Sequence, residues 1–515
     1  MQRLFLLLAL AAAWAVVLPA GVQAKTLRMA YAAAPASLDP HAELSAGTLQ
    51  LSHLVFDPLV RWTRKLTFEP RLAERWERLN ATTVRFYLRR GVTFHSGNPM
   101  TARDVVWTID RLKRSPGFKT LFAPLAAARA IDEHTVDLVT AKPYPLVLNL
   151  ATLVFPMDSA FYSGVDAGGR PKDDQGGSFA AANASGTGPF AVLAREPGVR
   201  VEFSRFDRYW DRASPGNVGR IVLTSIGEGP KRVAALLSGE VDFIAPVPPA
   251  SLARIRGDDR LSLVTKTGTR IVTLQLNQKR VPQFKDRRIR QAIAHAVDNA
   301  AIAKEVMGGF ATPAGQLSPR GFAGHNSALT PRYDLRQARD LMKEAGYEFG
   351  FSVTMMAPSN RYLNDDKIAR AVAAMLAKIN IEVSLKTLPE DRYRTKLDTR
   401  AADVMMVGWQ SDTEDSASFS EVLAMTPDEI TGVGRYNAGN YSNPTVDRLL
   451  QQSRSMTDLK GRAEILREIE RTLYEDAAFV PLHWQHLAWA ARKGVHIERV
   501  VNVMNLPYLG DLVID

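Results

Sequence analysis

The pattern of hydrophobic and polar positions is most regular between residues 351 and 408. Apolar residues alternate with polar ones at 351–355 and again at 381–385, which is the pattern of strands with one buried face. From 368 to 379 they recur at helical spacing, and a second, short helix precedes the apolar run at 404–407. Strand, helix, strand, helix and strand in this order predict an α/β fold with a parallel sheet and right-handed crossovers.

Elsewhere along the chain, the same patterns predict a mixture of strands and helices. Residues 83–88 alternate as a strand, and Thr101 is placed to cap the helix that follows. Pro230 and Gly239 mark the two ends of another helix, and Asp334 caps a third. No repeat with a period of about 20 to 50 residues is apparent, so a solenoid or propeller is not expected.

The loops after the predicted parallel strands bring several chemically useful side chains to one edge of the sheet. Arg361 follows the first strand, while Trp409, Asp412 and Asp415 lie at the end of the third or just after it. Ligands of such sheets bind beyond the carboxyl ends of the strands. A cation, an aromatic face and carboxylates on one rim predict a site for a small zwitterion.

Each of these residues also has an ordinary structural interpretation. Arg361 is equally consistent with a salt-bridged surface arginine, Asp412 with a helix cap or turn, and Trp409 with a core residue. Adjacent acids such as Glu414 and Asp415 are usually only solvated. Because all of them fall at one edge, the binding-site interpretation is favoured over the separate ones.

The N-terminus has the features of a signal peptide. Arg3 precedes an apolar run over residues 4–18, and Val22-Gln23-Ala24 is a suitable cleavage end. The run is shorter than the ~20 residues that span a membrane. The mature chain is therefore predicted to begin at Lys25 and to be exported, not embedded in a membrane. The chain has no cysteine to carry a lipid anchor, which favours a Gram-negative periplasm.

Composition and charge exclude several other classes of protein. The 515 residues predict more than one core, because a domain averages ~150 residues. A chain without cysteine has no disulfide scaffold, thiolate zinc site or cysteine nucleophile. The net charge of +11 arises from basic residues scattered among acidic ones, so no nucleic-acid partner is predicted.

Sequence motifs for catalysis or for cofactors are missing. The chain contains neither a Gly-x-Ser-x-Gly elbow, nor His-Glu-x-x-His, nor a phosphate-binding Gly-x-x-x-x-Gly-Lys-Ser/Thr loop. His483 and His486 are close in sequence but lack a nearby third ligand, so no metal site is predicted. No cofactor and no enzymatic activity are expected.

Short segments spread along the chain are each weak signals, but their order and spacing together are specific. With them, the chain resembles the extracytoplasmic solute-binding proteins of peptide- and nickel-type ABC transporters over nearly all of residues 25–515. The segments are 71–76 (RLAERW), 84–104, 186–190 (GTGPF), 209–210, 233–244, 284–298, 333–347, 407–412 (VGWQSD) and 440–450.

This resemblance implies a bilobal periplasmic-binding-protein fold with an extra α+β domain on the first lobe and two crossovers between the lobes. The crossovers are expected near residues 268–277 and 481–492. The implied parts are the signal peptide (1–24), a first lobe in three pieces (25–61, 185–268 and 486–515), an extra subdomain of that lobe (62–184) and a second lobe (269–485).

The resemblance also assigns roles to residues. In dipeptide-binding relatives an arginine of the second lobe binds the ligand carboxylate and an aspartate binds the amine, and Arg361 and Asp412 match these positions. Ser45 and Gly47 belong to a matching loop that supplies backbone contacts from the opposite lobe. The run Thr413 to Ser416 departs from the dipeptide pattern and leaves the ligand's identity open.

The function that follows is the capture of a short, dipeptide-like zwitterion by hinge closure and its delivery to a membrane permease. The protein is expected to be a periplasmic monomer without cofactors. Three alternatives remain open: a metal, metallophore or opine receptor on the same fold, an exported peptide hydrolase, and a periplasmic chaperone.

Overall fold

The computed structural model describes residues 25–33, 37–42, 46–166, 172, 178–359, 361–411, 415–428 and 432–515. The predicted signal peptide lies outside the described residues, as do Ser45 and Asp412. Within the described ranges, no helix combines the length and apolar character needed to cross a membrane.

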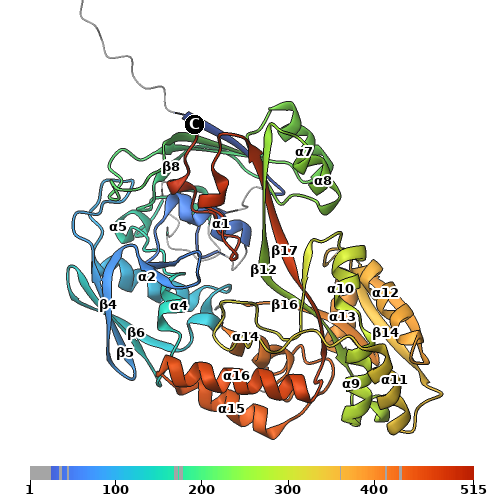
Figure 1. Cartoon of the computed structure of the whole chain (residues 1–515). Helices are drawn as coiled ribbons and strands as arrows, with labels where there is room; N and C mark the ends of the chain where they lie inside the picture. The colour runs from blue at the N-terminus through green and yellow to red at the C-terminus, as the bar shows by residue number, and fades with distance from the viewer. Residues whose placement is uncertain are drawn as a thin grey trace, which may run out of the picture.

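Two long antiparallel strands connect the two lobes of the molecule. They are β12 (Leu261–Leu276) and β17 (Val480–Arg492), which run side by side through the middle of Figure 1. Their ladder is interrupted between Thr267 and Ile271. Both belong to an 11-stranded sheet with the order β15-β14-β16-β12-β17-β11-β1-β10-β9-β8, and β13 pairs with β17 off this path.

The second lobe contains the predicted parallel sheet. Its strands are β14 (Phe351–Ser359), β15 (Ile381–Pro389) and β16 (Val404–Gln410), with β14 parallel to both of the others. The connections are the helices α12 (Asp365–Ala377) and α13 (Glu390–Asp398). The strand–helix–strand–helix–strand prediction is therefore confirmed in element type and order.

The first lobe contributes the other end of the same sheet. Here β1 (Lys25–Tyr31) lies between β10 (Val218–Ser225) and β11 (Phe243–Ala245) and is parallel to both. The helix α7 (Gly229–Ser238) connects β10 to β11, and Gly239 ends it with a positive φ of 81° as predicted. Beyond β10, the sheet continues with β9 (Arg200–Arg205) and ends at its edge strand, β8 (Phe190–Glu196).

A separate four-stranded sheet extends the first lobe. The helix α2 (Ala102–Arg114) packs on it and begins with a capping box formed by Thr101 and Asp104. The predicted strand at 83–88 is present, with every second residue buried. The sheet has the order β4 (Ala73–Asn80), β5 (Thr83–Leu88), β7 (Thr135–Thr140) and β6 (Leu125–Asp132).

Along both β12 and β17, the residues that pack into the core of the first lobe are separated from those that pack into a core of the second lobe. In β12, Val264 packs with the first lobe and Ile271 with the second. In β17, Trp484 packs with the second lobe and Leu487 with the first. The short stretches between these residues belong to neither core, and both predicted crossovers are present. The residue at which each domain begins stays a prediction.

The GTGPF segment has a packing role. A Cβ on Gly186 would lie 2.0 Å from the carbonyl oxygen of Val55, at the end of α1 (Ala46–Val55), and one on Gly188 would lie 2.5 Å from the carbonyl carbon of the same residue. Side chains at either position would therefore force α1 away. Between them, the Thr187 hydroxyl accepts a hydrogen bond from the Asp57 backbone at 3.2 Å.

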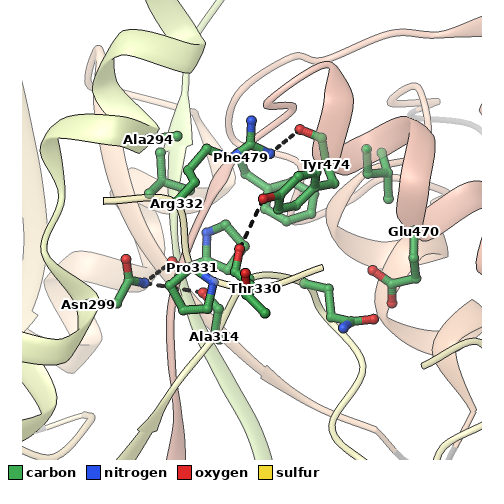
Figure 2. Close-up of a pocket in the computed structure, with 14 residues that line it drawn as sticks. Ala294, Asn299, Ala314, Thr330, Pro331, Arg332, Glu470, Tyr474 and Phe479 are labelled. Carbon is green, nitrogen blue, oxygen red and sulfur yellow. Dashed lines mark hydrogen bonds between the residues drawn. The ribbon is translucent and has the colours of Figure 1, made fainter. Parts of the chain in front are cut away.

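In the second lobe, the buried side-chain amide of Asn299 forms hydrogen bonds that hold a long loop against β17. Asn299 donates from its side chain to the carbonyl oxygens of Ala314, Pro481 and Leu482, at 3.2, 2.7 and 2.8 Å. Figure 2 shows this side chain beside a small cavity of about 20 Å³, which has room for about one water. The bonds hold the residues after Pro313 against the crossing strand.

Glu470 anchors the same loop from the other side. It lies on α16 (Leu459–Glu475), is fully buried, and accepts hydrogen bonds from the backbone N–H groups of Leu317 (3.2 Å) and Ser318 (3.0 Å) and from the Ser318 hydroxyl. Burial raises the pKa of its carboxyl to about 7, although these hydrogen bonds oppose the rise.

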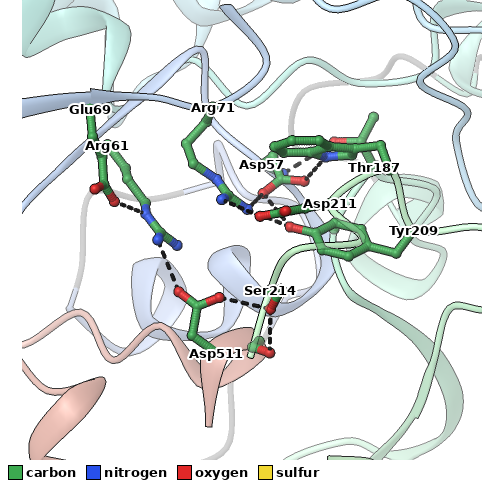
Figure 3. A network of polar contacts seen from close by, with 12 residues as sticks. Asp57, Arg61, Glu69, Arg71, Thr187, Tyr209, Asp211, Ser214 and Asp511 are labelled. Atoms are coloured by element: carbon green, nitrogen blue, oxygen red, sulfur yellow. Dashed lines mark hydrogen bonds and ion pairs between the residues drawn. The ribbon is translucent and has the colours of Figure 1, made fainter. Parts of the chain in front are cut away.

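A network of ion pairs joins distant parts of the first lobe (Figure 3). Its buried centre is Arg71, whose guanidinium binds Asp57 at 2.8 Å and Asp211 at 3.1 Å. Arg61 binds Asp511 of the C-terminal segment at 2.9 Å, and Ser214 donates to the same carboxylate at 2.9 Å. The network therefore ties three of the chain segments that build this lobe.

Replacing Asp57 by alanine is expected to destabilise the protein by about 3–5 kcal/mol, because it leaves the buried Arg71 without its nearest counter-charge. Denaturant unfolding measures this loss. The matched control is Lys231→Met, which breaks an exposed pair with Glu228 and should cost no more than about 1 kcal/mol. Equal losses for the two variants would show that the network is not stabilising.

Glu470 should make stability depend on pH. Its folded pKa lies above its unfolded value of 4.5, so its contribution is complete below pH 4.5 and is lost as the pH rises through about 7. We expect the free energy of unfolding of the wild type to fall by about 3 kcal/mol over this interval relative to the Glu470→Gln variant. A difference between the two proteins that does not change with pH would contradict the assignment.

Candidate ligand-binding cleft

A row of side chains crosses the sheet where the strands pass between the lobes. Trp409 of β16 is opposite Ile271 of β12, Ile271 is opposite Trp484 of β17, and Trp484 is opposite Thr312 of β13 (Ala311–Pro313). Opposite residues of antiparallel strands project to the same face. The two tryptophans therefore lie on one face, with Ile271 between them.

Trp409 lies at the carboxyl end of β16, as predicted. Its ring packs against Tyr436 with centroids 5.3 Å apart. Its indole N–H is buried and has no hydrogen-bond partner among the described residues. Trp409 is only half-buried and lines a cavity, so it combines the predicted aromatic surface with contacts to a second-lobe core.

Arg361 is linked to the strand that carries Trp409. Its Nε donates to the Tyr362 hydroxyl at 3.0 Å, and that hydroxyl accepts from the Gly408 backbone N–H at 2.8 Å. Its Nη1 pairs with Glu390 at 2.5 Å. The salt bridge expected if Arg361 has only a structural role is therefore present. These partners use only part of the several N–H donors of a guanidinium, and the side chain is still 25% exposed.

Asp415 lies in a buried ion pair. Its carboxylate accepts from the Ala417 backbone at 2.9 Å, which caps α14 (Ser416–Leu423), and binds Arg462 of α16, with Nη2 to Oδ1 at 3.1 Å. Both charged side chains are less than 5% exposed. The carboxylate is therefore occupied by Arg462, and its predicted contact with a ligand stays a prediction.

The remaining predicted residues divide between the lobes. Gly47 lies in the first turn of α1, in the first lobe. Ser45 and Asp412 are outside the described residues, although Asp412 follows β16 by two positions. Their contacts with a ligand also stay predictions.

Two cavities lie along the cleft. The first, which we name the outer cavity, has a volume of about 810 Å³ and lies between residues 120–146 of the extra domain and residues 409–462 of the second lobe. Tyr144 and Trp409 contribute aromatic surface to it from the two sides. Its volume is within the range of about 300–1,000 Å³ that is common for small-molecule sites.

The second cavity, the hinge cavity, has a volume of about 480 Å³. It is lined by residues 266–269 of β12, by the loop 312–331, by Trp484 and, from the C-terminal segment of the first lobe, by Val503. No sequence pattern indicated this cavity in advance. The loop that follows β13, residues 314–331, has no hydrophobic period, and the available signal was its length without a regular element, which is typical of functional loops.

The histidines close in sequence do not form a metal cluster. His483 is buried, and burial lowers its pKa to about 4. His486 forms a hydrogen bond with the Thr312 hydroxyl at 2.7 Å. Over the described part of the chain, no group of three or more histidines and acids could hold a metal ion.

Comparison with known proteins agrees with this architecture. The dipeptide-binding protein of Escherichia coli (strain K12) is 27% identical over 496 residues, which is 90% of each chain. The periplasmic murein tripeptide binding protein MppA, in its unliganded open form, has a TM-score of 0.81 at 21% identity, covering 96% of this chain and 98% of the other. The dipeptide binding protein from Pseudoalteromonas sp. SM9913, in complex with Met-Leu, has a TM-score of 0.73 at 22% identity. The match covers 95% of this chain and 100% of the other.

The family model for bacterial extracellular solute-binding proteins, family 5, matches residues 67–428. This match spans well over half of the chain and includes Arg361, Trp409 and nearly all of the extra domain. The protein therefore belongs to the family 5 bacterial extracellular solute-binding proteins.

Proposed function

We propose that the protein is the periplasmic solute-binding component of a peptide-type ABC transporter. It binds a short, dipeptide-like zwitterion between its lobes, closes around it and presents it to the membrane permease. The observation that carries this proposal is the link from Arg361 through the Tyr362 hydroxyl to Gly408. Gly408 is the neighbour of Trp409, which lines the outer cavity between the extra domain and the second lobe.

Arg361 is suited to the carboxylate of such a solute. A guanidinium is a planar fork that matches a carboxylate with two parallel hydrogen bonds. Closure removes water from both charges, and a buried charge without a partner costs several kcal/mol. The amine of the solute therefore requires a counter-charge, for which Asp412, two residues beyond β16, is the proposed residue.

The connections between the lobes support a closing motion. Only short stretches of β12 and β17 lie between the two cores, and the ladder is interrupted there. The chain matches the unliganded open form of MppA better than the Met-Leu complex, with TM-scores of 0.81 and 0.73, which supports an open state for this arrangement. A ligand shifts such an equilibrium by binding the closed state more tightly.

The Arg361→Met variant is expected to bind the dipeptide Met-Leu about 100-fold more weakly than the wild type, since truncating one partner of a buried charge pair costs about 2–5 kcal/mol. Isothermal titration calorimetry measures this change. The control is Arg370→Met on α12, which removes an exposed arginine paired with Asp366 and should bind normally. Equal affinities for the wild type and the Arg361→Met variant would refute the role of Arg361.

Blocking either end of the dipeptide should weaken binding by a comparable factor. N-acetyl-Met-Leu lacks the charged amine and Met-Leu amide lacks the carboxylate, so each leaves one buried protein charge without its partner. The same titration compares them with Met-Leu. If both blocked forms bind as well as Met-Leu does, the protein does not recognise a zwitterion.

Solute binding should also make the molecule more compact. The radius of gyration measured by small-angle X-ray scattering is expected to fall at saturating Met-Leu, because the lobes approach each other. The solute recovered after denaturation should be intact, because the proposed role involves no chemistry. A radius of gyration that is identical with and without bound solute would argue against hinge closure.

A further inference from the structure

The two cavities of the cleft differ in the charges on their walls. In the outer cavity, both lining arginines have acidic partners: Arg454 pairs with Glu421 at 2.8 Å, and Arg462 pairs with Asp415. The exposed Lys142 of the same cavity has no ion-pair partner among the described residues. In the hinge cavity, the cations Lys266 and Arg320 have no ion-pair partner among the described residues.

No acidic side chain offsets these charges from the wall of the hinge cavity. Among the described residues that line it, none is an aspartate or a glutamate. A cleft lined by one sign of charge concentrates ions of the opposite sign, because its low-dielectric walls focus the field. Lys266 is half-buried in this cavity and Arg320 lies at its exposed side. The hinge cavity is therefore a favourable environment for an anion.

A buried hydroxyl on the wall of the same cavity provides a second, independent observation. Thr269 lies in the interrupted part of the β12 ladder and is only 3% exposed. Its hydroxyl has no hydrogen-bond partner among the described residues. A buried polar group without a partner costs about 1–3 kcal/mol, so a structure that retains one gains when a ligand oxygen supplies the missing bond.

The rest of the hinge cavity is mainly apolar and well anchored. Phe322, Leu329 and Trp484 contribute buried apolar surface. The Trp484 indole donates to the Leu317 carbonyl at 3.0 Å, and His325 donates from Nδ1 to the Ser318 carbonyl at 2.9 Å. These bonds hold Trp484 and His325 against the loop that forms the wall.

We propose that the hinge cavity binds an acidic group of the solute, a second carboxylate beyond the one assigned to Arg361. Lys266 and Arg320 neutralise its charge, and the Thr269 hydroxyl donates to one of its oxygens. The substrate class is then a short peptide-like zwitterion with an acidic side chain or tail carried on an apolar body. This inference rests on the proposed function, because it treats the cavity as part of the same cleft.

The test compares matched acidic and neutral ligands by calorimetry. The pairs are Met-Glu with Met-Gln, Glu-Met-Leu with Gln-Met-Leu, and the small probes benzoate and benzamide. The wild type is expected to bind the acidic member of at least one pair about tenfold more tightly, which is the worth of one charge-assisted hydrogen bond. In the double variant Lys266→Met/Arg320→Met this preference should fall to about twofold or less.

Two further variants separate binding from folding. Thr269→Val should reduce the acidic preference while leaving thermal stability equal or higher, because it removes an unsatisfied buried hydroxyl. Lys493→Met removes an exposed lysine at the far end of β17, outside the cavity, and should leave the preference unchanged.

The outcomes decide between the two proposals. A wild type without an acidic preference in any pair, or a preference that survives in the double variant, overturns the role of the hinge cavity. If Arg361→Met leaves Met-Leu binding intact while the acidic preference still depends on Lys266 and Arg320, the zwitterion site is wrong and the acidic cavity stands. If Arg361→Met abolishes Met-Leu binding and the pairs show no preference, the zwitterion site stands and the acidic role of the hinge cavity is wrong.

Discussion

The ladder formed by β12 and β17 is the constraint on which the rest of the structure depends. Each strand leaves one apolar core and enters the other, so neither lobe is complete without both strands. Backbone hydrogen bonds hold the strands together except between Thr267 and Ile271. That interruption coincides with the stretches of the two strands that belong to neither core, and it is the proposed place of rotation between the lobes.

The same interruption lies beside the proposed binding surface. Around it lie the two tryptophans of the crossing row, the unpartnered hydroxyl of Thr269 and the cation Lys266. Arg71, which is buried away from the cleft, has close acidic partners and stabilises the first lobe. Lys266 and Arg320 of the hinge cavity lack such partners among the described residues, and an acidic group of the solute is proposed to supply one.

Local patterns in the chain were sufficient to predict the elements that carry the site. Alternation and helical spacing over 351–408 predicted the order of strands and helices, and the rule for the carboxyl ends of strands placed Arg361 near Trp409. Asp412 and Asp415 could not be told apart in this way. Asp415 binds Arg462, which lies 47 residues further along the chain, and a pairing over that distance leaves no local signal.

The sequence by itself therefore determined the α/β class, the parallel sheet and the residues at the carboxyl ends of its strands, because periodicity and turn residues act over a few neighbouring positions. Only the tertiary structure decided which charges are neutralised and where space remains. The hinge cavity is built from β12, the loop 312–331, Trp484 and Val503, which come together only when both lobes are folded around the crossing strands. Charge pairing and enclosed volume are properties of such long-range contacts, and no single segment of the chain contains them.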